Sequence, residues 1–195
     1  QTIVVLPVFN QLRHAPHFKP YLEDVLMYGL VRYQEEFGTN DYGLPFFKLY
    51  ESYTMKEVAK LANYDKKHSA FRGSGLLTYQ NDFFLFVDLH KEEDIKESIN
   101  YQDQFISADK FQWQSPNATT QDSERGQKII HNKEKGINLH LFVRKFKKID
   151  GEVQPYIYIG RGNTIHAEGN KPITIQMELE HKIPAALYRE FNYKV

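Results

Sequence analysis

The sequence predicts an α+β fold: N-terminal helices, then a strongly curved antiparallel or mixed β-sheet or small β-barrel, and a closing C-terminal helix. Apolar residues recur at helical spacing over residues 21–37, whereas five or so short segments after Phe71 alternate apolar and polar residues, as half-buried strands do. The sequence shows no regular alternation of strand and helix patterns. A doubly wound parallel sheet is therefore not expected.

Residues 1–65 are expected to form a helical segment. The apolar spacing over residues 21–37 ends at Gly38, and Thr54-Met-Lys-Glu57 matches a capping box, in which the hydroxyl and the carboxylate bond free amides at a helix start. A short helix to about Asn63 should follow. The two helices are too far apart in sequence for a helix-turn-helix, so DNA recognition by this pair is not favoured.

Residues 66–195 are expected to form the curved-sheet or barrel domain. Residues 75–79 and 83–89 flank Gln80-Asn-Asp82, which predicts a hairpin. A short helix is predicted from Ser123 to Lys135, ended by Gly136. The remaining elements are strands over residues 138–146, 156–159 and 173–180, and a closing helix over residues 184–191 that has Pro at its first turn.

The composition excludes several classes of function. The chain has 195 residues with 25 basic and 25 acidic side chains, so no global field draws it onto nucleic acid, and any DNA site must be local. It contains no cysteine, which excludes disulfides and thiolate metal sites and fits a cytoplasmic location. It shows no targeting signal or membrane-spanning segment. Because it begins at Gln1 without Met, we expect it to be a piece of a longer protein.

Enzymatic activity is the minority hypothesis. The sequence has no phosphate-binding loop, and Gly160-Arg-Gly162 has the wrong spacing for a dinucleotide site, so no cofactor is expected in this chain. Strand alternation divides residues 178–181 between two faces, which argues against a metal site there. A divergent Mg²⁺-dependent nuclease remains an alternative, and its catalytic residues would be Glu168, Glu180 and Lys182.

A polar run over residues 111–127 surrounds the single Trp of the chain and has matched hydrogen-bond donors and acceptors. Its amides and hydroxyls suit base edges and phosphate oxygens, although a solvated loop anchored by a core Trp is an equal alternative. Arg144 and Arg161 lie in later segments and can reach phosphates. The candidate DNA-binding residues are Gln112, Trp113, Gln114, Ser115, Asn117, Thr119, Thr120, Arg125, Gln127, Lys128, Arg144 and Arg161.

Two basic groups accompany these residues. One follows the polar run and the other ends the next predicted strand; they comprise Arg125, Lys128, His131, Lys133 and Lys135, and Arg144, Lys145, Lys147 and Lys148. The groups are expected to supply phosphate contacts beside the amides that read base edges, although solvated lysines on turns are an equal alternative. Tyr79, Tyr156 or Trp113 could stack on a base drawn out of a duplex.

Several ordered segments match one known family: Phe111-Gln-Trp-Gln-Ser-Pro-Asn-Ala-Thr119, Gly126-Gln127, Leu141-Phe-Val-Arg144, Tyr158-Ile-Gly160, His166-Ala-Glu-Gly169 and Leu179-Glu-His-Lys-Ile-Pro184. Through them, the chain from about Leu49 to its end resembles domain of unknown function 3427. That family is the carboxy-terminal module of bacterial DEAD/DEAH-type helicases that often carry a phospholipase-D-like nuclease domain. The family offers no established catalytic residues. Pro116 stands where the family tends to have a polar residue, which puts a base-edge contact there in doubt.

The resemblance implies antiviral defence or restriction machinery, with residues 1–65 linking to an upstream helicase. Such machinery needs a reader that locates its target, often a compact curved-sheet domain of the PUA, SRA or B3 kind. Our main hypothesis is therefore a non-catalytic module that recognises a specific sequence or modified double-stranded DNA. The alternatives are the divergent nuclease and a protein-docking module that regulates the helicase. The expected partners are DNA and the upstream helicase and nuclease domains, with no membrane.

Overall fold

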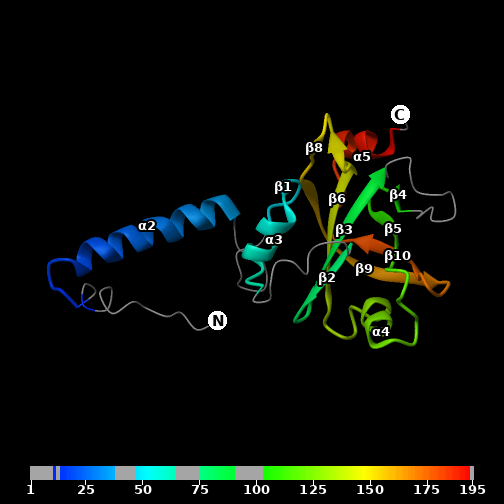
Figure 1. Ribbon diagram of the computed structural model, residues 1–195, viewed down its shortest axis with the longest axis horizontal. Helices are drawn as coiled ribbons and strands as arrows, with labels where there is room; N and C mark the ends of the chain where they lie inside the picture. Colours follow the sequence, from blue (N-terminus) through cyan, green and yellow to red (C-terminus); the bar gives the residue numbers. More distant parts are fainter. Residues whose placement is uncertain (1–10, 12–13, 38–46, 65–74, 91–102, 194–195) are drawn as a thin grey trace. The chain divides into compact units, whose positions relative to one another are not determined.

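The protein is described by a computed structural model that covers residues 11, 14–37, 47–64, 75–90 and 103–193 (Figure 1). The chain divides into two compact units, residues 1–48 with 61–65 and residues 49–60 with 66–195. Residues 49–60, which the sequence suggested as part of the helical segment, thus group with the sheet. The predicted domain boundary after residue 65 stays a prediction.

Helix α2 of the first unit spans Lys19–Phe37, as the apolar spacing predicted. In the second unit, α3 spans Met55–Leu61 up to the unit boundary, and the predicted capping box is present. The Glu57 carboxylate accepts hydrogen bonds from the Thr54 backbone N–H at 2.7 Å and hydroxyl at 2.8 Å, and the Thr54 hydroxyl accepts from the Glu57 N–H. These bonds satisfy amides that a helix start leaves open.

The second unit is built on one mixed sheet, with strand order β2-β3-β6-β9-β10-β5-β4 and β1 paired to β9 (Figure 1). The strands are β1 Ser52–Tyr53, β2 Leu76–Tyr79, β3 Asp82–His90, β4 Gln104–Ser107, β5 Lys110–Gln114, β6 Asn138–Phe146, β9 Tyr156–Glu168 and β10 Thr174–Leu179. Strands β7 Lys148–Ile149 and β8 Glu152–Val153 form a separate hairpin. Among the described pairings, only β3 and β6 run parallel.

The fold class is confirmed as α+β with a large mixed sheet. The predicted hairpin is β2–β3, where Tyr79 pairs with Asp82. Strands β2 and β4 are edges of the described sheet, so it is not closed and the small barrel is not supported. Register shifts interrupt the β6–β9 and β9–β10 pairings, and such irregularities bend and twist a sheet locally.

Two short helices complete the second unit: α4 spans Glu124–Ile130 and α5 spans Ala185–Asn192. Helix α5 agrees with the predicted closing helix. Helix α4 ends well before the predicted Gly136, because turns occupy residues 131–136 and Gly136, at φ +63°, ends that turn segment instead. The two helices lie at opposite ends of the unit (Figure 1).

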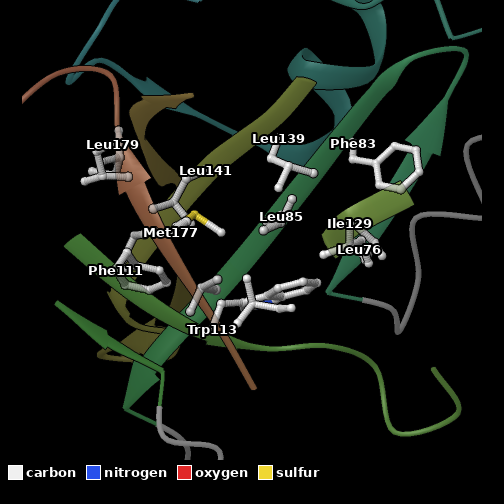
Figure 2. Close-up of a cluster of buried hydrophobic side chains, with 14 of the residues drawn as sticks. Leu76, Phe83, Leu85, Phe111, Trp113, Ile129, Leu139, Leu141, Met177 and Leu179 are labelled. Carbon is white, nitrogen blue, oxygen red and sulfur yellow. The ribbon is translucent and has the colours of Figure 1, made fainter. Parts of the chain in front are cut away.

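Strand alternation gives the sheet two buried faces. One face carries the main core, to which Ile129 of α4 and Phe191 of α5 contribute. In Figure 2 the Trp113 indole lies within this cluster of buried side chains. Because successive side chains of a strand point to opposite faces, Phe84 and Phe86 leave this cluster and line the second face.

The second face is aromatic and contains a buried polar chain. Phe142 contacts Phe86 and Tyr158 from neighbouring strands and Tyr53 from β1. Within this layer, His140 Nε2 lies 3.0 Å from Asp82 Oδ1, and His140 Nδ1 lies 3.0 Å from the Tyr158 hydroxyl. Buried polar groups need such partners, so this chain of contacts ties β3, β6 and β9 together.

Candidate functional site: a polar surface built from two loops

The polar run begins as a strand, which the sequence reasoning missed. Residues 110–114 form β5 between β10 and β4, so its side chains alternate between buried environments. Trp113 is only 3% exposed and Gln112 8% exposed. The Trp113 indole therefore presents no accessible ring face for the base stacking that the sequence had suggested. Burial favours the other expected role, an anchor beneath the loop that follows.

The end of β5 is bonded to the loop between β9 and β10. The Ser115 N–H donates to the Ile173 carbonyl at 2.9 Å, and the Ile173 N–H donates to the Ser115 hydroxyl at 2.9 Å. The Gln114 N–H donates to the Asp103 carboxylate at 2.7 Å. Ser115 is fully buried, so its hydroxyl serves the fold rather than a surface contact.

Residues 116–123 continue as a loop that is bonded to residues 169–172. The Lys171 N–H donates to the Thr119 carbonyl at 3.3 Å. Gln121 makes two further links: its N–H donates to Asn170 Oδ1 at 3.0 Å, and its Nε2 donates to the Gly169 carbonyl at 2.6 Å. We call residues 115–127 and 169–172 together the paired-loop surface.

Helix α4 is packed tightly onto this loop. Ser123 caps the helix by accepting the Gly126 N–H at 3.1 Å, and Gln127 Nε2 donates to the Gln121 carbonyl at 3.0 Å. A Cβ on Gly126 would lie 2.0 Å from the Thr120 carbonyl oxygen. Glycine at this position is therefore required by the close approach of two backbones.

Much of the polar run thus holds the paired-loop surface together, and fewer groups face solvent. Asn117, Arg125, Asn170 and Lys171 are exposed. Thr120 and Gln127 are half-buried, and the Lys128 ammonium bonds Glu124 Oε1 at 2.7 Å, which lowers the pKa of that carboxyl. No described acidic group forms an ion pair with Arg125 or Lys171. These two cations are the best placed for anionic ligands.

One buried hydroxyl of this surface lacks a bond. Thr119 is 3% exposed, and its Oγ1 has no hydrogen-bonding partner among the described residues. Its carbonyl, by contrast, accepts the Lys171 N–H. A buried hydroxyl without a hydrogen-bonding partner lowers stability. The described residues at the junction of the two loops supply no such partner to Thr119 Oγ1.

Arg144, a predicted DNA contact, is instead part of the folded interior. Its guanidinium bonds both carboxylate oxygens of Asp88, at 2.6 and 3.1 Å, and donates to the Gln154 carbonyl at 2.8 Å. It also lies 4.1 Å from the centre of the Tyr156 ring. Only 7% of the residue is exposed. Its guanidinium, which the sequence suggested as a phosphate contact, is therefore bonded to groups of the protein itself.

The two basic groups lie apart. Lys133 and Lys135 precede β6, whereas Lys145, Lys147 and Lys148 lie at or beyond its end. The eight residue steps from Asn138 to Phe146 span roughly 26 Å of extended strand. The second group therefore lies at the far end of β6 from the paired-loop surface.

The residues of the nuclease alternative are not brought together. Glu168 pairs in register with Thr174, at the opposite end of β10 from Glu180, which places the two roughly 20 Å apart. Each has another partner: Glu180 bonds Arg161 Nε at 2.8 Å, Lys182 lies 3.3 Å from Asp109, and Glu168 lies 3.6 Å from His166. Arg161, a predicted phosphate contact, is thus already paired with a carboxylate.

Other candidate features can be placed in the same way. Tyr156 is buried beneath Arg144, and Tyr79 is half-buried on the edge strand β2. Within the described ranges, no cluster of three His, Cys, Asp or Glu residues is arranged to hold a metal ion. The same part of the chain has no helix long and apolar enough to cross a membrane.

A shallow groove of about 150 Å³ lies at the Arg144 end of the second unit. Apolar and polar residues both line it, namely Ser52, Arg144, Lys145, Phe146, Ile149, Gln154, Pro155, Ile157, Glu190 and Phe191. Nothing in the sequence pattern predicted this groove, because it is formed by strand ends and α5, which are distant in sequence.

Sequence reasoning missed Gln121, Asn170 and Lys171. The signal for the second loop was the turn composition of Gly169-Asn-Lys-Pro172, since Gly, Asn and Pro all favour turns. Its neighbour in space could not be read from the sequence, because the contact with residues 119–121 spans about fifty residues.

Comparisons with known proteins give a family match and likenesses to solved structures. No curated protein matches the chain. The solved structure described as "Crystal Structure of SUVH5 SRA bound to fully hydroxymethylated CG DNA" is similar with a TM-score of 0.44 and 11% identity, over 72% of this chain and 96% of that chain. The family described as "Domain of unknown function (DUF3427)" matches residues 47–191. The chain belongs to this family.

Proposed function

We propose that this chain is a DNA-recognition module and that its paired-loop surface contacts double-stranded DNA, either a specific sequence or a modified base. One observation carries the proposal: the polar run is hydrogen-bonded to a second loop, which holds exposed donors of both loops in fixed positions. A preorganised set of donors loses little conformational entropy on binding.

The exposed groups suit the two parts of DNA recognition. Arg125 and Lys171 can contact phosphate oxygens, and Asn117 places an exposed amide side chain, a type that contacts base edges, on the same surface. Asp122 and Glu124 are exposed on the same surface and balance Arg125 and Lys171, so its formal charge is zero. We therefore expect weak non-specific affinity, with a salt dependence corresponding to about two or three phosphate contacts.

In the parent protein, this module would direct an ATP-dependent helicase and a nuclease of a cytoplasmic restriction or antiviral defence machinery. The motor would supply most of the non-specific affinity for the DNA backbone. The module itself would hold no cofactor and perform no catalytic step. Among the described residues, the set named for a nuclease lies apart, which supports this division of roles.

The decisive experiment is fluorescence polarisation with matched duplexes that carry plain, methylated, hydroxymethylated, glucosylated or phosphorothioate DNA. We expect one member of the panel to bind at least about tenfold more tightly than the plain duplex, which corresponds to about 1.4 kcal/mol. If the folded chain binds none of them, the proposal is wrong.

Two substitutions separate recognition from backbone attraction. Asn117→Ala should reduce the preference between panel members, whereas Arg125→Ala should weaken all of them similarly and flatten the salt dependence by about 0.9 in slope. Lys147→Ala, an exposed change at the far end of β6, is the matched control and should leave binding unchanged. Equal losses for Lys147→Ala and Arg125→Ala would argue against the paired-loop surface.

The absence of catalysis has its own test. Supercoiled plasmid incubated with the chain and Mg²⁺ or Mn²⁺ should remain intact, since a recognition module leaves the phosphodiester bonds unbroken. Nicking that Glu168→Gln or Glu180→Gln abolishes would support the nuclease alternative instead.

The groove at the Arg144 end favours a second candidate, docking of the helicase portion of the parent protein. Its apolar lining residues, which include Ile149 with 49% of its maximum area exposed, resemble the centre of a small protein interface. Pull-down with the upstream helicase fragment, with Ile149→Asp as the test variant, checks this role. Retention that is unaffected by Ile149→Asp would count against docking at the groove.

A further inference from the structure

We infer that the β9–β10 loop is a second DNA-contacting element, with Lys171 and Asn170 as its contact residues and Gln121 as their positioning residue. This inference rests on the proposed function and deepens it, since it gives Lys171, Asn170 and Gln121 separate roles within the paired-loop surface. The chemistry to be recognised is a phosphate oxygen beside a hydrogen-bond acceptor on a nucleotide.

Gln121 connects three segments of the chain. Its N–H bonds Asn170 Oδ1 at 3.0 Å, its Nε2 bonds the Gly169 carbonyl at 2.6 Å, and its carbonyl accepts Gln127 Nε2 at 3.0 Å. Gln121 therefore links the β9–β10 loop, the polar run and α4. Loss of the Gln121 side chain removes only the bond to Gly169, which is the shortest of the three.

Asn170 is oriented by the same contact. Its Oδ1 accepts the Gln121 N–H, so its Nδ2 group is the one left to donate elsewhere. The residue is exposed, and an amide donor held in this way can bond an acceptor atom of a nucleotide without losing further rotamer entropy. A free surface Asn would lack this orientation.

Lys171 is held in an unusual backbone conformation. Its φ is +58°, in the left-handed region that L side chains rarely adopt, and its N–H is bonded to the Thr119 carbonyl. Glycine would adopt this conformation without strain. The side chain is exposed and forms no ion pair with a described acidic residue, so no described salt bridge accounts for a lysine here.

The junction that carries Lys171 also contains the unsatisfied hydroxyl. Thr119, whose carbonyl accepts the Lys171 N–H, has a buried Oγ1 without a partner among the described residues. An unsatisfied group and a strained backbone at one junction both cost stability. Such features are concentrated at binding sites, where a preformed shape serves the ligand rather than the fold.

Polarisation titrations of the full chain test the inference, with a plain duplex of about 20 base pairs and its 5-hydroxymethylcytosine counterpart as probes. Lys171→Gln should weaken binding to both duplexes about three- to tenfold, and the slope of log affinity against log salt should fall by about 0.9. Lys171→Arg should retain both properties. Lys147→Gln, at the far end of β6, is the charge-matched control and should change neither.

Gln121→Ala removes no charge, so a different result is expected. Affinity should fall while the salt slope stays at the wild-type value, and hydrogen exchange at the Lys171 amide should become faster because its loop is less constrained. A purely structural role would speed exchange without any loss of affinity, and that outcome would overturn the positioning role.

DNA binding by the whole chain and DNA contact by the β9–β10 loop are tested by different outcomes. If the folded wild-type chain binds neither duplex nor any other modified duplex of the panel, the proposed function itself is wrong. If the wild type binds and Lys171→Gln keeps the wild-type affinity and salt slope, the DNA site excludes the β9–β10 loop and only this inference is overturned.

Discussion

The paired-loop surface and the Arg144 end of the sheet both contain basic and amide side chains but use their polar residues differently. At the Arg144 end, the guanidinium is buried and its bonds go to Asp88 and Gln154. At the paired-loop surface, glutamine and serine side chains make the internal bonds, and Arg125 and Lys171 remain exposed without an ion pair to a described acidic residue.

This difference shows why residue type alone is a weak guide to a contact residue. Amides were favoured as base-reading groups, yet those of Gln121 and Gln127 stabilise the backbone of the candidate surface. An arginine has the strongest donors of any side chain, and burial turns them toward the protein's own acceptors. A candidate DNA-contact residue is therefore better identified by its exposed donors that make no described bond within the fold than by its residue type.

Trp113→Ala should have the largest effect and tests whether the paired-loop surface depends on its anchor. Removing a buried indole should lower the free energy of unfolding by about 3–5 kcal/mol, measured by urea denaturation. Trp113→Phe should lose less, because it keeps an aromatic ring in the same cluster. A Trp113→Ala variant that remains fully stable but cannot bind DNA would indicate that the indole contacts DNA directly.

Arg144→Ala should have the next largest effect and tests the opposite end. It leaves the Asp88 carboxylate without its main partner, so we expect the unfolding free energy to fall by about 3 kcal/mol. Lys147→Ala, an exposed change three residues later, is the control and should be nearly neutral. If Arg144→Ala had normal stability but had lost DNA affinity, Arg144 would be a DNA contact rather than a structural residue.

Gly126→Ala should have a smaller effect, confined to the paired-loop surface. Alanine normally favours a helix, but here its Cβ would meet the Thr120 carbonyl oxygen, so we expect a net loss of about 1–3 kcal/mol in a thermal melt. Arg125→Ala, one residue earlier and exposed, should melt like the wild type. A Gly126→Ala protein with unchanged melting would mean that the loop shifts at no cost.

Alkaline pH should affect the aromatic face through a smaller, graded effect. Burial, with the charges of Glu180 and Asp82, raises the pKa of the Tyr158 phenol above its usual value. Above about pH 10 the unfolded chain therefore releases a proton that the folded chain retains, so stability is complete below that pH and is lost as pH rises.

Melting temperatures recorded between about pH 8 and pH 11 check this dependence. Tyr158→Phe should begin less stable, because it loses the hydroxyl contact with His140, but its stability should fall less steeply with pH. An identical slope in the two proteins would show that Tyr158 does not cause the alkaline loss.

Local elements could be predicted from the sequence because their signals are local. The apolar period of α2, the Thr54–Glu57 capping box and the β2–β3 hairpin each depend on residues within one element or turn. Strand β5 was missed because Gln112 and Gln114, flanking the single Trp, read as solvent-facing polar residues rather than as a strand packed between two neighbours.

The candidate site could be predicted only in part. The polar run over residues 111–127 was identified from its composition, and the structure exposes Asn117 and Arg125 but buries Trp113, Ser115 and Thr119. Its second loop lies about fifty residues later in the chain, and no local pattern relates Gln121 to Asn170. Contact between distant segments follows from sheet pairing, here β5 with β10, and not from spacing.

By itself, the sequence determined the α+β class, the absence of a global charge that would draw the chain to DNA and the polar region around Trp113, because composition and periodicity carry this information. Only the tertiary structure decided that Arg144 pairs with Asp88, that Trp113 is buried and that Lys171 is exposed beside the polar run. The physical reason is that a polar side chain's role depends on which partners folding brings within hydrogen-bonding distance, and most of those partners are remote in sequence.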